Sequence, residues 1–447
     1  MQLGAHVTRP LMLQAPLHAP PARHSGFVGF VAVMCFILLT IPLGRLQETF
    51  LGGWTVPKLM IPMLFLLMFG SRAGRISLHP HLPYFLLFVA LTTPSLLSNT
   101  DQYPSILLNF VGYALLFLLV YNGLSSIRDL RRILLAYLLG LSSVSSLAAL
   151  AFFTGYDLGE SLDRPFVENW YGLPIFLGTE DNPGAYGTFF VSGLPIAFMF
   201  FLTVKNRLLK LGIATLGLLF LASVVLTFSR SGIIGAVLGC LLLYHYRKNR
   251  KTISLRLLAF FLLFAVLVMN FSSLFFSVMD FTSGDVSVHE ANSVAANKED
   301  SQGYRLILLE HFFPIIVDNP LFGVGYGNLS RIMEEATGLH LNAHNIFLGV
   351  AVEFGLLACF FFCTVIILSM RTVVMVISTI ENRSDRLTLG CVFASFVGLL
   401  FHGMFHEIYV NMMLWLFVAL GATCRRFRNI HGGGVAYLKK LESNEAG

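Results

Sequence analysis

The sequence has little charge. Only 12% of its 447 residues are Asp, Glu, Lys or Arg, whereas 56% are hydrophobic. Soluble domains carry about 25% charged residues, and the mean hydropathy here is +0.74. A water-soluble globular protein is therefore excluded, and an all-α polytopic membrane protein is predicted.

Cysteine is also scarce. All six cysteines fall within or at the end of apolar stretches, so neither a disulfide framework nor a cysteine metal site is implied. His402 and His406 stand four residues apart beside Glu407, but Gly403 occupies the place where the zinc-protease pattern needs glutamate. We expect a polar cluster at the membrane interface there, with metal ligation as the alternative.

A phosphate-binding loop is absent as well. The segment "LFGVGYGN", residues 321–328, is rich in glycine. It has neither the strand before it nor the lysine and spacing that a nucleotide loop requires. A nucleotide-binding function is therefore not indicated.

Long apolar runs are abundant. A helix needs about 20 mostly apolar residues to cross a bilayer, which predicts about twelve spans. We place them at 26–44, 55–71, 82–98, 104–122, 132–153, 183–204, 208–228, 231–246, 254–276, 343–369, 387–402 and 409–424. The chain then divides into a disordered tail (1–25), nine spans (26–276), a large outer loop (277–342), three spans (343–424) and a second tail (425–447).

Positive charge is unevenly distributed over this layout. With both termini on one side, only seven of the 30 lysines and arginines fall on the other. The positive-inside rule predicts cytoplasmic termini and an outer loop at 277–342. Cations on the outer side are unexpected under this rule, which suggests that they have a function there. Arg164, Arg230, Arg305 and Arg331 are among them.

Two outer segments, 154–182 and 277–342, are long enough to be structured. Within the second, residues 304–320 place Leu308, Phe312 and Ile316 at helical spacing and end near Pro320. The pattern predicts a short amphipathic helix on the outer membrane surface, with Arg305 in its first turn.

Arg230 directly follows an apolar run and precedes Ser231 and Gly232. The small residues that follow it permit close approach of another helix or a ligand. Arginine at a helix start opposes the helix dipole unless an anion is present. The interpretation is an anion site on the outer face; the alternative is a side chain that reaches lipid phosphate.

The segment "NAHNIFLGVAVEFG", residues 342–355, opens the tenth span. His344 can exchange protons near neutral pH, although a structural role is the alternative. Glu353 is nine residues further on, about 900° of helix rotation, and so faces away from His344. A carboxylate within a span usually faces the bundle interior, so Glu353 is expected to be a supporting group there.

Arg230 in "TFSRSG", Arg305 in "GYRLILLEHFFPIIVDNPLFGVGYGN" and His344 in "NAHNIFLGVAVEFGLL" together resemble the O-antigen ligase and polymerase superfamily of bacterial membrane glycosyltransferases. The resemblance is strongest over 183–424. It implies an enzyme of the bacterial inner membrane, with a periplasmic site, that acts in lipopolysaccharide or other surface polysaccharide synthesis without metal or cofactor. The implied donor is a glycan on undecaprenyl diphosphate. The acceptor is a glycan hydroxyl such as that of lipid A core, and no nucleic acid takes part.

The resemblance also suggests roles for individual residues. Arg230 and Arg305 would bind the diphosphate, and His344 would accept the proton of the attacking hydroxyl. Further candidates for substrate binding are Asn345, Arg164, Arg331, Glu353, His402 and His406.

Two alternatives stay open. A polymerase of the same superfamily is one, although the Arg-x10-Gly pattern of some polymerases is absent, since Ile175, Ile316 and Asn342 stand eleven residues after the three outer-loop arginines. A transporter is the other, because a twelve-span bundle with Glu353 inside it could serve an ion pathway. However, no repeated half is visible in the sequence.

Overall fold

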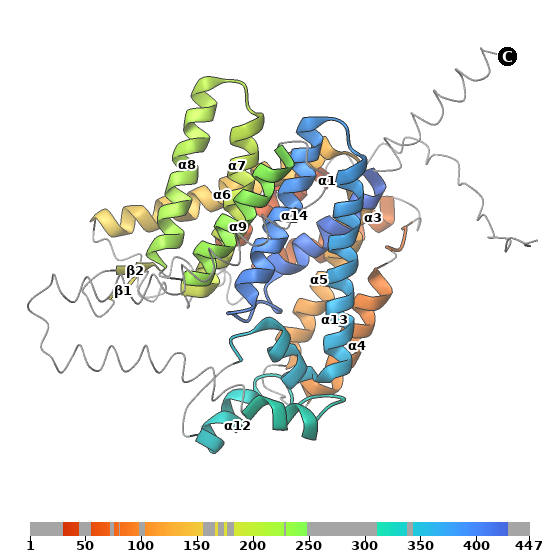
Figure 1. Cartoon of the computed structure of the whole chain (residues 1–447). Helices are drawn as coiled ribbons and strands as arrows, with labels where there is room; N and C mark the ends of the chain where they lie inside the picture. Colours follow the sequence, from red (N-terminus) through yellow and green to blue (C-terminus); the bar gives the residue numbers. More distant parts are fainter. Residues whose placement is uncertain are drawn as a thin grey trace, which may run out of the picture.

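The computed structural model describes residues 30–43, 55–71, 76–79, 81–97, 103–154, 166–168, 174–176, 183–227, 229–247, 311–337 and 343–427. Helices dominate these ranges (Figure 1). They are α1 (Phe30–Thr40) with a 3-10 turn (Ile41–Leu43), α3 (Val56–Ser71), α4 (Leu82–Leu97), α5 (Tyr103–Gly123), α6 (Ile127–Thr154), α7 (Pro183–Thr203), α8 (Arg207–Leu226), α9 (Arg230–Arg247), α12 (Asn328–Thr337), α13 (Ile346–Thr379) and α14 (Arg383–Gly403). Residues 311–318 and 412–427 are also helical.

Helices occupy every predicted span except 254–276, which lies outside the described residues. Within the described part, six helices are long and apolar enough to cross a membrane: Ile106–Gly123, Ile127–Leu147, Ala185–Thr203, Arg207–Leu226, Ile346–Thr379 and Arg383–Gly403. Shorter apolar helices are Phe30–Leu43, Val56–Gly70 and Leu82–Leu97. The chain is thus a multi-pass helical membrane protein, while the count of twelve spans stays a prediction.

One small sheet departs from the wholly helical expectation. β1 (Phe166–Glu168) and β2 (Pro174–Phe176) pair antiparallel, with Phe166 opposite Phe176. They lie in segment 154–182, which is predicted to lie on the outer side and is long enough to be structured. The hairpin is near one end of α8 (Figure 1).

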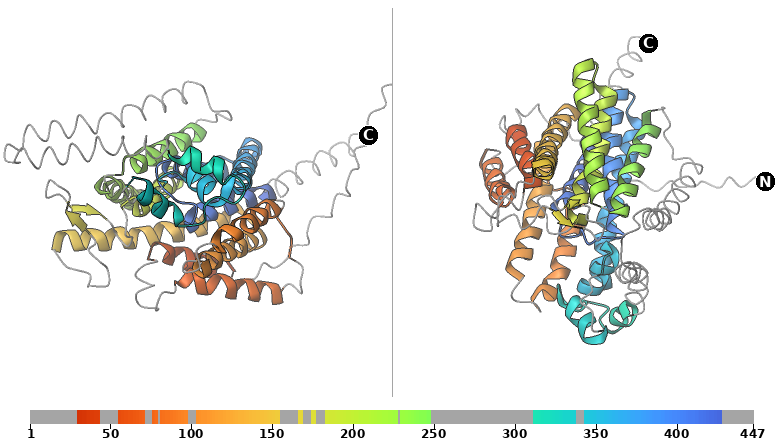
Figure 2. Two further views of the ribbon diagram at one scale, coloured as in Figure 1. Left: turned by 90° about the horizontal axis from the view of Figure 1, so that it is seen from below. Right: turned by 90° about the vertical axis from the view of Figure 1, so that its left-hand side faces the viewer.

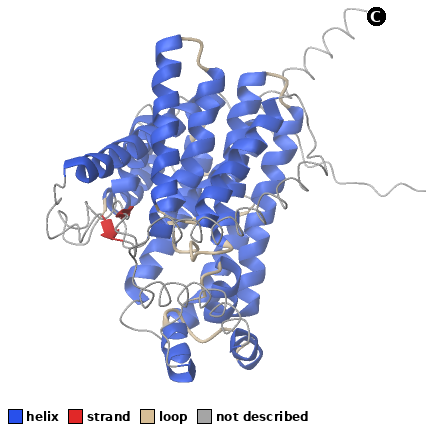
Figure 3. Cartoon of the chain, turned by 60° about the vertical axis from the view of Figure 1, so that its left-hand side comes forward, coloured by secondary structure: helices blue, strands red, loops and turns tan. Residues whose placement is uncertain are grey.

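The connections between long helices fall at two ends of the bundle. The α7–α8 and α13–α14 connections share one end, and α12 lies at the opposite end (Figures 1 and 3). The first two connections carry helix caps: the Asn206 and Asn382 side chains each accept hydrogen bonds from two backbone N–H groups of the following helix. Arg131 of α6 reaches the start of α14, where its guanidinium donates to Asp385 at 3.0 Å.

Helices α7, α8, α9 and α14 pack together (Figure 2). The α9–α14 contact depends on glycine, because a Cβ at Gly235 would lie 2.7 Å from the Gly398 carbonyl oxygen. Gly239 approaches the Ala394 carbonyl of α14 in the same way, at 3.0 Å. The small-residue face of α9 predicted from the sequence is therefore occupied by a helix, as is typical of close membrane-helix pairs.

The other half of the bundle is held by aromatic packing. Trp415 is fully buried, and its ring meets those of Phe85, Phe88, Phe362 and Tyr113 at centroid distances of 4.7–6.0 Å. The Trp415 indole N–H donates to the Tyr409 carbonyl at 2.6 Å. This packing anchors the turn that precedes residues 412–427, which contributes to the candidate site.

Candidate functional site

Most of the sequence-predicted site residues that the structure describes lie where three elements meet, and Arg331 of α12 is the exception among them. The three elements are the start of α9, the start of α13 and the segment 402–411 that follows α14. Arg164 and Arg305 lie outside the described residues, so their predicted roles stay predictions.

Arg230 is the first residue of α9 and is half-buried. Its neighbour Ser231 shares a hydrogen bond with Nδ1 of His402, with 2.9 Å between Oγ and nitrogen. His402 is fully buried in the last turn of α14. This contact fixes the start of α9 against the end of α14 and places Arg230 at that junction.

The start of α13 is fixed to the same segment. The backbone N–H of His344 donates to Oε1 of Glu407 at 3.1 Å, and the Asn345 amide donates to the Met404 carbonyl at 3.0 Å. The Asn345 side-chain oxygen caps α13 by accepting from the N–H groups of Phe347 and Leu348. Both polar ends of Asn345 thus bind the protein itself, which favours a structural role over its predicted contact with substrate.

His344 has an unusual backbone. Its φ of 45° lies in the left-handed region. Within the described ranges, no other non-glycine residue has a positive φ. Such a conformation is uncommon outside glycine, although His, Asn and Asp tolerate it better than other residues. The His344 side chain is exposed. Strained backbone often marks functional positions, and here the Glu407 carboxylate holds it in place.

Glu353 lies on the bundle interior, as the sequence predicts, and is 6% exposed. Its Oε1 accepts a hydrogen bond from the backbone N–H of Gly327 at 3.0 Å, and its Oε2 accepts one from the Tyr409 hydroxyl. The Glu353 carbonyl accepts from the Gly325 N–H at 3.1 Å and from the Ser95 hydroxyl. Glu353 therefore joins α13 to the glycine-rich loop, to α4 and to the segment after α14.

Helix α13 is broken at Gly355, whose φ is 87°. Backbone groups of α13 at the break form hydrogen bonds with the glycine-rich loop. The Val352 carbonyl accepts from the Val324 N–H at 2.9 Å, and the Leu356 N–H donates to the Pro320 carbonyl at 2.8 Å. A Cβ on Gly355 would lie 2.3 Å from the Leu321 oxygen. The glycines of "LFGVGYGN" and of "VEFG" therefore allow the backbones of the loop and of α13 to approach each other closely.

His402, His406 and Glu407, for which metal ligation is the alternative prediction, lie at the end of α14 and in the residues that follow it. Their interactions run to different partners, and the His402 and His406 ring centroids are 5.5 Å apart. Within the described ranges, no group of three or more His, Cys, Asp or Glu side chains is placed to hold a metal ion. Burial, together with the nearby His402 and His344, lowers the pKa of His406 to about 3, so this imidazole is neutral at physiological pH.

Glu407 is predicted as part of the polar cluster with His402 and His406, or as a metal ligand with them. It is half-buried, and burial raises the pKa of its carboxyl, while hydrogen bonds from the backbone of His344 and Ala343 oppose the rise. An ionisable residue near the membrane is expected to have a partner. Here the partner is a backbone N–H, which leaves no signal in the sequence.

Arg331 lies apart from this cluster. It is on α12, where its guanidinium nitrogen is 3.9 Å from Oε1 of Glu335, one helical turn further on. Both side chains are about 70% exposed. A surface pair of this kind contributes little to stability, and the contact leaves the predicted role of Arg331 in substrate binding untested.

The predicted amphipathic helix is present in part, since residues 311–318 are helical. Phe312 packs in a small core with Leu329, Met333 and Val352, while Phe313 is 72% exposed. This core fixes the helix to α12 and α13. Residues 304–310 lie outside the described ranges.

Residues 214–363 match the family model described as O-antigen ligase. The match includes Arg230, Arg305, Arg331, His344, Asn345 and Glu353, and it ends before His402 and His406. No curated protein matches the chain. The match confirms the resemblance to the O-antigen ligase superfamily on which the sequence prediction rests.

Proposed function

Because an O-antigen ligase region occupies residues 214–363, we propose that the protein is a membrane glycosyltransferase of the ligase type. It transfers a glycan from undecaprenyl diphosphate to a hydroxyl of an acceptor glycan such as lipid A core. The observation that carries the proposal is the junction of α9, α13 and segment 402–411, which supports bringing Arg230 and His344 to one outer cleft.

In the proposed reaction, the acceptor hydroxyl oxygen attacks the anomeric carbon of the donor sugar. The bond from that carbon to the diphosphate oxygen breaks, and its electron pair leaves on the diphosphate. The hydroxyl proton passes to His344, which acts as general base. The products are the joined glycan, undecaprenyl diphosphate and a protonated imidazole.

Arg230 contributes by charge. Negative charge grows on the diphosphate as the bond breaks, so a fixed guanidinium stabilises the transition state more than the ground state. Its position in the first turn of α9 adds the positive end of the helix dipole. Arg305 is proposed to approach the same phosphates from the outer loop.

Glu407 and Glu353 support the base indirectly. Glu407 holds the His344 backbone at its strained φ. Glu353 fixes the glycine-rich loop against α13 and segment 402–411. Both are positioning residues in this proposal, and neither touches the reacting atoms.

The test measures donor binding and transfer separately on purified protein. Arg230→Ala should lose transfer and weaken retention of undecaprenyl diphosphate. Arg230→Lys should restore little, because an ammonium cannot reproduce the two-pronged guanidinium contact. Arg207→Ala is the matched control, since that arginine is exposed at the start of α8 and is not among the predicted site residues. Full transfer by Arg230→Ala would overturn the diphosphate site.

The same assay distinguishes the remaining alternatives. Transfer that survives a chelator supports the proposed metal-free mechanism, whereas loss that one divalent metal restores would assign ligands to the outer face. A donor that also serves as acceptor would make the protein a polymerase. Glycan-independent ion flux through the purified protein in vesicles, abolished by Glu353→Gln, would favour a transporter instead.

A further inference from the structure

The arginine proposed for the diphosphate, Arg230, stands between two serines whose hydroxyls are both engaged. On one side, the Ser229 hydroxyl accepts a hydrogen bond from the backbone N–H of Gly232 at 3.2 Å and so caps the start of α9. On the other side, the Ser231 hydroxyl shares a hydrogen bond of 2.9 Å with Nδ1 of His402. The backbone from which the Arg230 side chain extends is therefore held on both sides.

His402 is fully buried in the last turn of α14. Helices α9 and α14 have little room to shift against each other, because a Cβ at Gly235 would lie 2.7 Å from the Gly398 carbonyl oxygen, and the reverse distance is also 2.7 Å. A fully buried ring is not accessible to a substrate, whereas this ring does reach Ser231. The arrangement suits a side chain that supports Arg230 and does not itself contact the donor.

The residues that follow His402 reach the start of α13. A Cβ at Gly403 would lie 3.3 Å from the Ile346 side chain. The Met404 carbonyl accepts from the Asn345 amide at 3.0 Å. Three consecutive residues thus contact the starts of both α9 and α13, and they set the spacing between these two helix starts.

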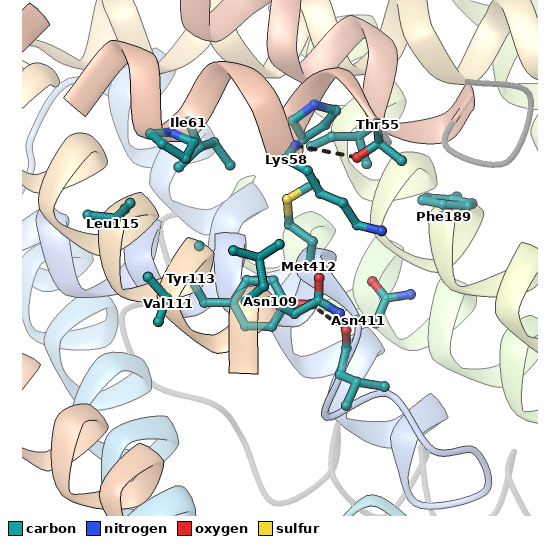
Figure 4. A pocket seen from close by; sticks show the side chains of 16 residues that line it. Thr55, Lys58, Ile61, Asn109, Val111, Tyr113, Leu115, Phe189, Asn411 and Met412 are labelled. Carbon is teal, nitrogen blue, oxygen red and sulfur yellow. Dashed lines mark hydrogen bonds between the residues drawn. The ribbon is translucent and has the colours of Figure 1, made fainter. Parts of the chain in front are cut away.

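The far end of segment 402–411 is also fixed to the bundle. The Tyr113 hydroxyl of α5 donates to the Val410 carbonyl, beside Asn411 and at the edge of a cavity of about 280 Å³ that these residues line (Figure 4). The segment that supports Arg230 is therefore held at both of its ends. Charges that are fixed before the substrate arrives stabilise a transition state without a cost of reorganisation.

We infer that His402 positions Arg230 for the leaving diphosphate by anchoring Ser231. The inference rests on the proposed function, in which Arg230 holds that diphosphate. Catalysis by a fixed group depends on its placement, and a misplacement of about 1 Å can cost on the order of 10²-fold in rate. Loss of the anchor should act on the donor side alone, because His344 is held separately by Glu407.

Substitutions at His402 separate this role from packing. Asparagine places its amide at about the position of Nδ1, so His402→Asn keeps a hydrogen-bond partner for Ser231. Glutamine places its amide nearer Nε2, so His402→Gln loses that partner, and Ser231→Ala removes the other one. His245→Gln, at the opposite end of α9, is the matched control for a buried histidine. Ser142→Ala is the control for serine, since that exposed hydroxyl bonds within α6.

The measurements use the purified full-length protein. Native mass spectrometry gives retention of undecaprenyl diphosphate, and transfer from a glycan linked to undecaprenyl diphosphate gives KM and kcat for the donor. His402→Gln and Ser231→Ala should each weaken retention and raise the donor KM about tenfold, as expected for loss of a hydrogen bond, and His402→Asn should restore most of the effect. The double variant should be no worse than either single one, because both remove the same bond. Glu407→Ala should lower kcat instead and retain the donor.

The outcomes separate this inference from the proposed function. If Arg230→Ala loses the donor but His402→Gln retains it as well as His245→Gln does, the inference is overturned and the diphosphate site stands. Equal loss in His402→Asn and His402→Gln would also overturn it, since packing would then explain the effect. If Arg230→Ala itself retains the donor, the diphosphate site fails, and the inference with it. Thermal unfolding checks each variant against its control, and if His402→Gln does not fold, Ser231→Ala decides.

Discussion

At the scale of single residues, the junction of α9, α13 and segment 402–411 combines a strained backbone with an exposed side chain at His344. The strain is compatible with only a few residue types, because the left-handed region accepts glycine freely and asparagine, aspartate or histidine at moderate cost. This restriction makes it possible to change the chemistry of position 344 while its backbone is kept.

We therefore predict that His344→Asn folds normally and loses turnover by about 10² to 10⁴-fold, the usual contribution of a general base. Retention of undecaprenyl diphosphate should not change. His344→Gly serves as the control for backbone strain and should be equally inactive. Transfer at the wild-type rate by His344→Asn would return His344 to a purely structural role.

A second residue-scale feature lies at the other end of the bundle. The backbone N–H of His81 donates to Nδ1 of His79 at 2.9 Å, and Nε2 of His79 lies 2.8 Å from the Ala422 carbonyl. This geometry requires a neutral imidazole with its proton on Nε2. Burial, His81 and Arg425 lower the pKa of His79 to about 3.

Stability should consequently fall on the acid side. The unfolded chain binds a proton near pH 6.5, whereas folded His79 resists protonation down to about pH 3. The stabilisation that neutral His79 contributes to the fold is thus complete above pH 6.5. It is lost progressively below that pH, and the loss is on the order of 2 kcal/mol by pH 5. Thermal unfolding of detergent-solubilised protein against pH measures this, and His79→Gln should flatten the profile. An unchanged slope in that variant would refute the assignment.

At the scale of elements, the apolar runs predict where helices lie and less well where they end. α6 begins at Ile127, five residues before the predicted span. Its first turns are charged and fall outside the predicted span 132–153, and there Arg132 pairs with Asp129 at 3.2 Å and Asp129 accepts from Ser126. Hydropathy does not register such paired charges.

The break in α13 likewise cannot be predicted from the pattern of apolar residues. Residues 346–379 form one long apolar run, and the glycine at 355 is one of many in the chain. Its role depends on a loop that docks from outside the helix. The grouping of Arg230 with His344 is expected from the family resemblance alone. The Ser231–His402 and His344–Glu407 hydrogen bonds that support it could be identified only in the structure.

Gly355→Ala should destabilise the protein. The φ of 87° and ψ of 166° at Gly355 lie in a region that is essentially restricted to glycine and costs another residue about 1–3 kcal/mol. A Cβ 2.3 Å from the Leu321 oxygen adds a steric clash. Gly217→Ala, in an open part of α8, should be neutral or stabilising by about 0.5–1 kcal/mol. Thermal unfolding compares the two. Equal stability of both variants would show that the loop does not dock on α13 as described.

At the scale of the whole molecule, the charge distribution and the fold agree on two distinct ends. The α7–α8 and α13–α14 connections share one end, opposite α12 (Figure 1). The first end carries Lys205, Arg207 and Arg383, and the positive-inside rule predicts that it is cytoplasmic. The sequence predicts this polarity because the rule depends on composition, not on packing.

Cysteine labelling with a membrane-impermeant reagent checks the orientation. Ala336→Cys on α12, where the side chain is exposed, should label in cells with a permeabilised outer membrane. Glu381→Cys, in the α13–α14 connection, should label only after the inner membrane is opened. The wild-type chain, whose cysteines are buried or half-buried, gives the background. The reverse labelling pattern would invert the topology.

The contacts around α13 and segment 402–411 also differ in how far apart their partners are along the chain. Glu353 and Gly327 are separated by 26 residues, whereas Ser231 and His402 are separated by 171, and Tyr113 and Val410 by 297. Closing a short loop costs less chain entropy, so the loop can dock on α13 early, as soon as that helix has been synthesised. Segment 402–411 is made last and supplies one partner in the second and third of these contacts. The junction of α9, α13 and segment 402–411 is therefore completed only when the C-terminal part of the chain has been inserted.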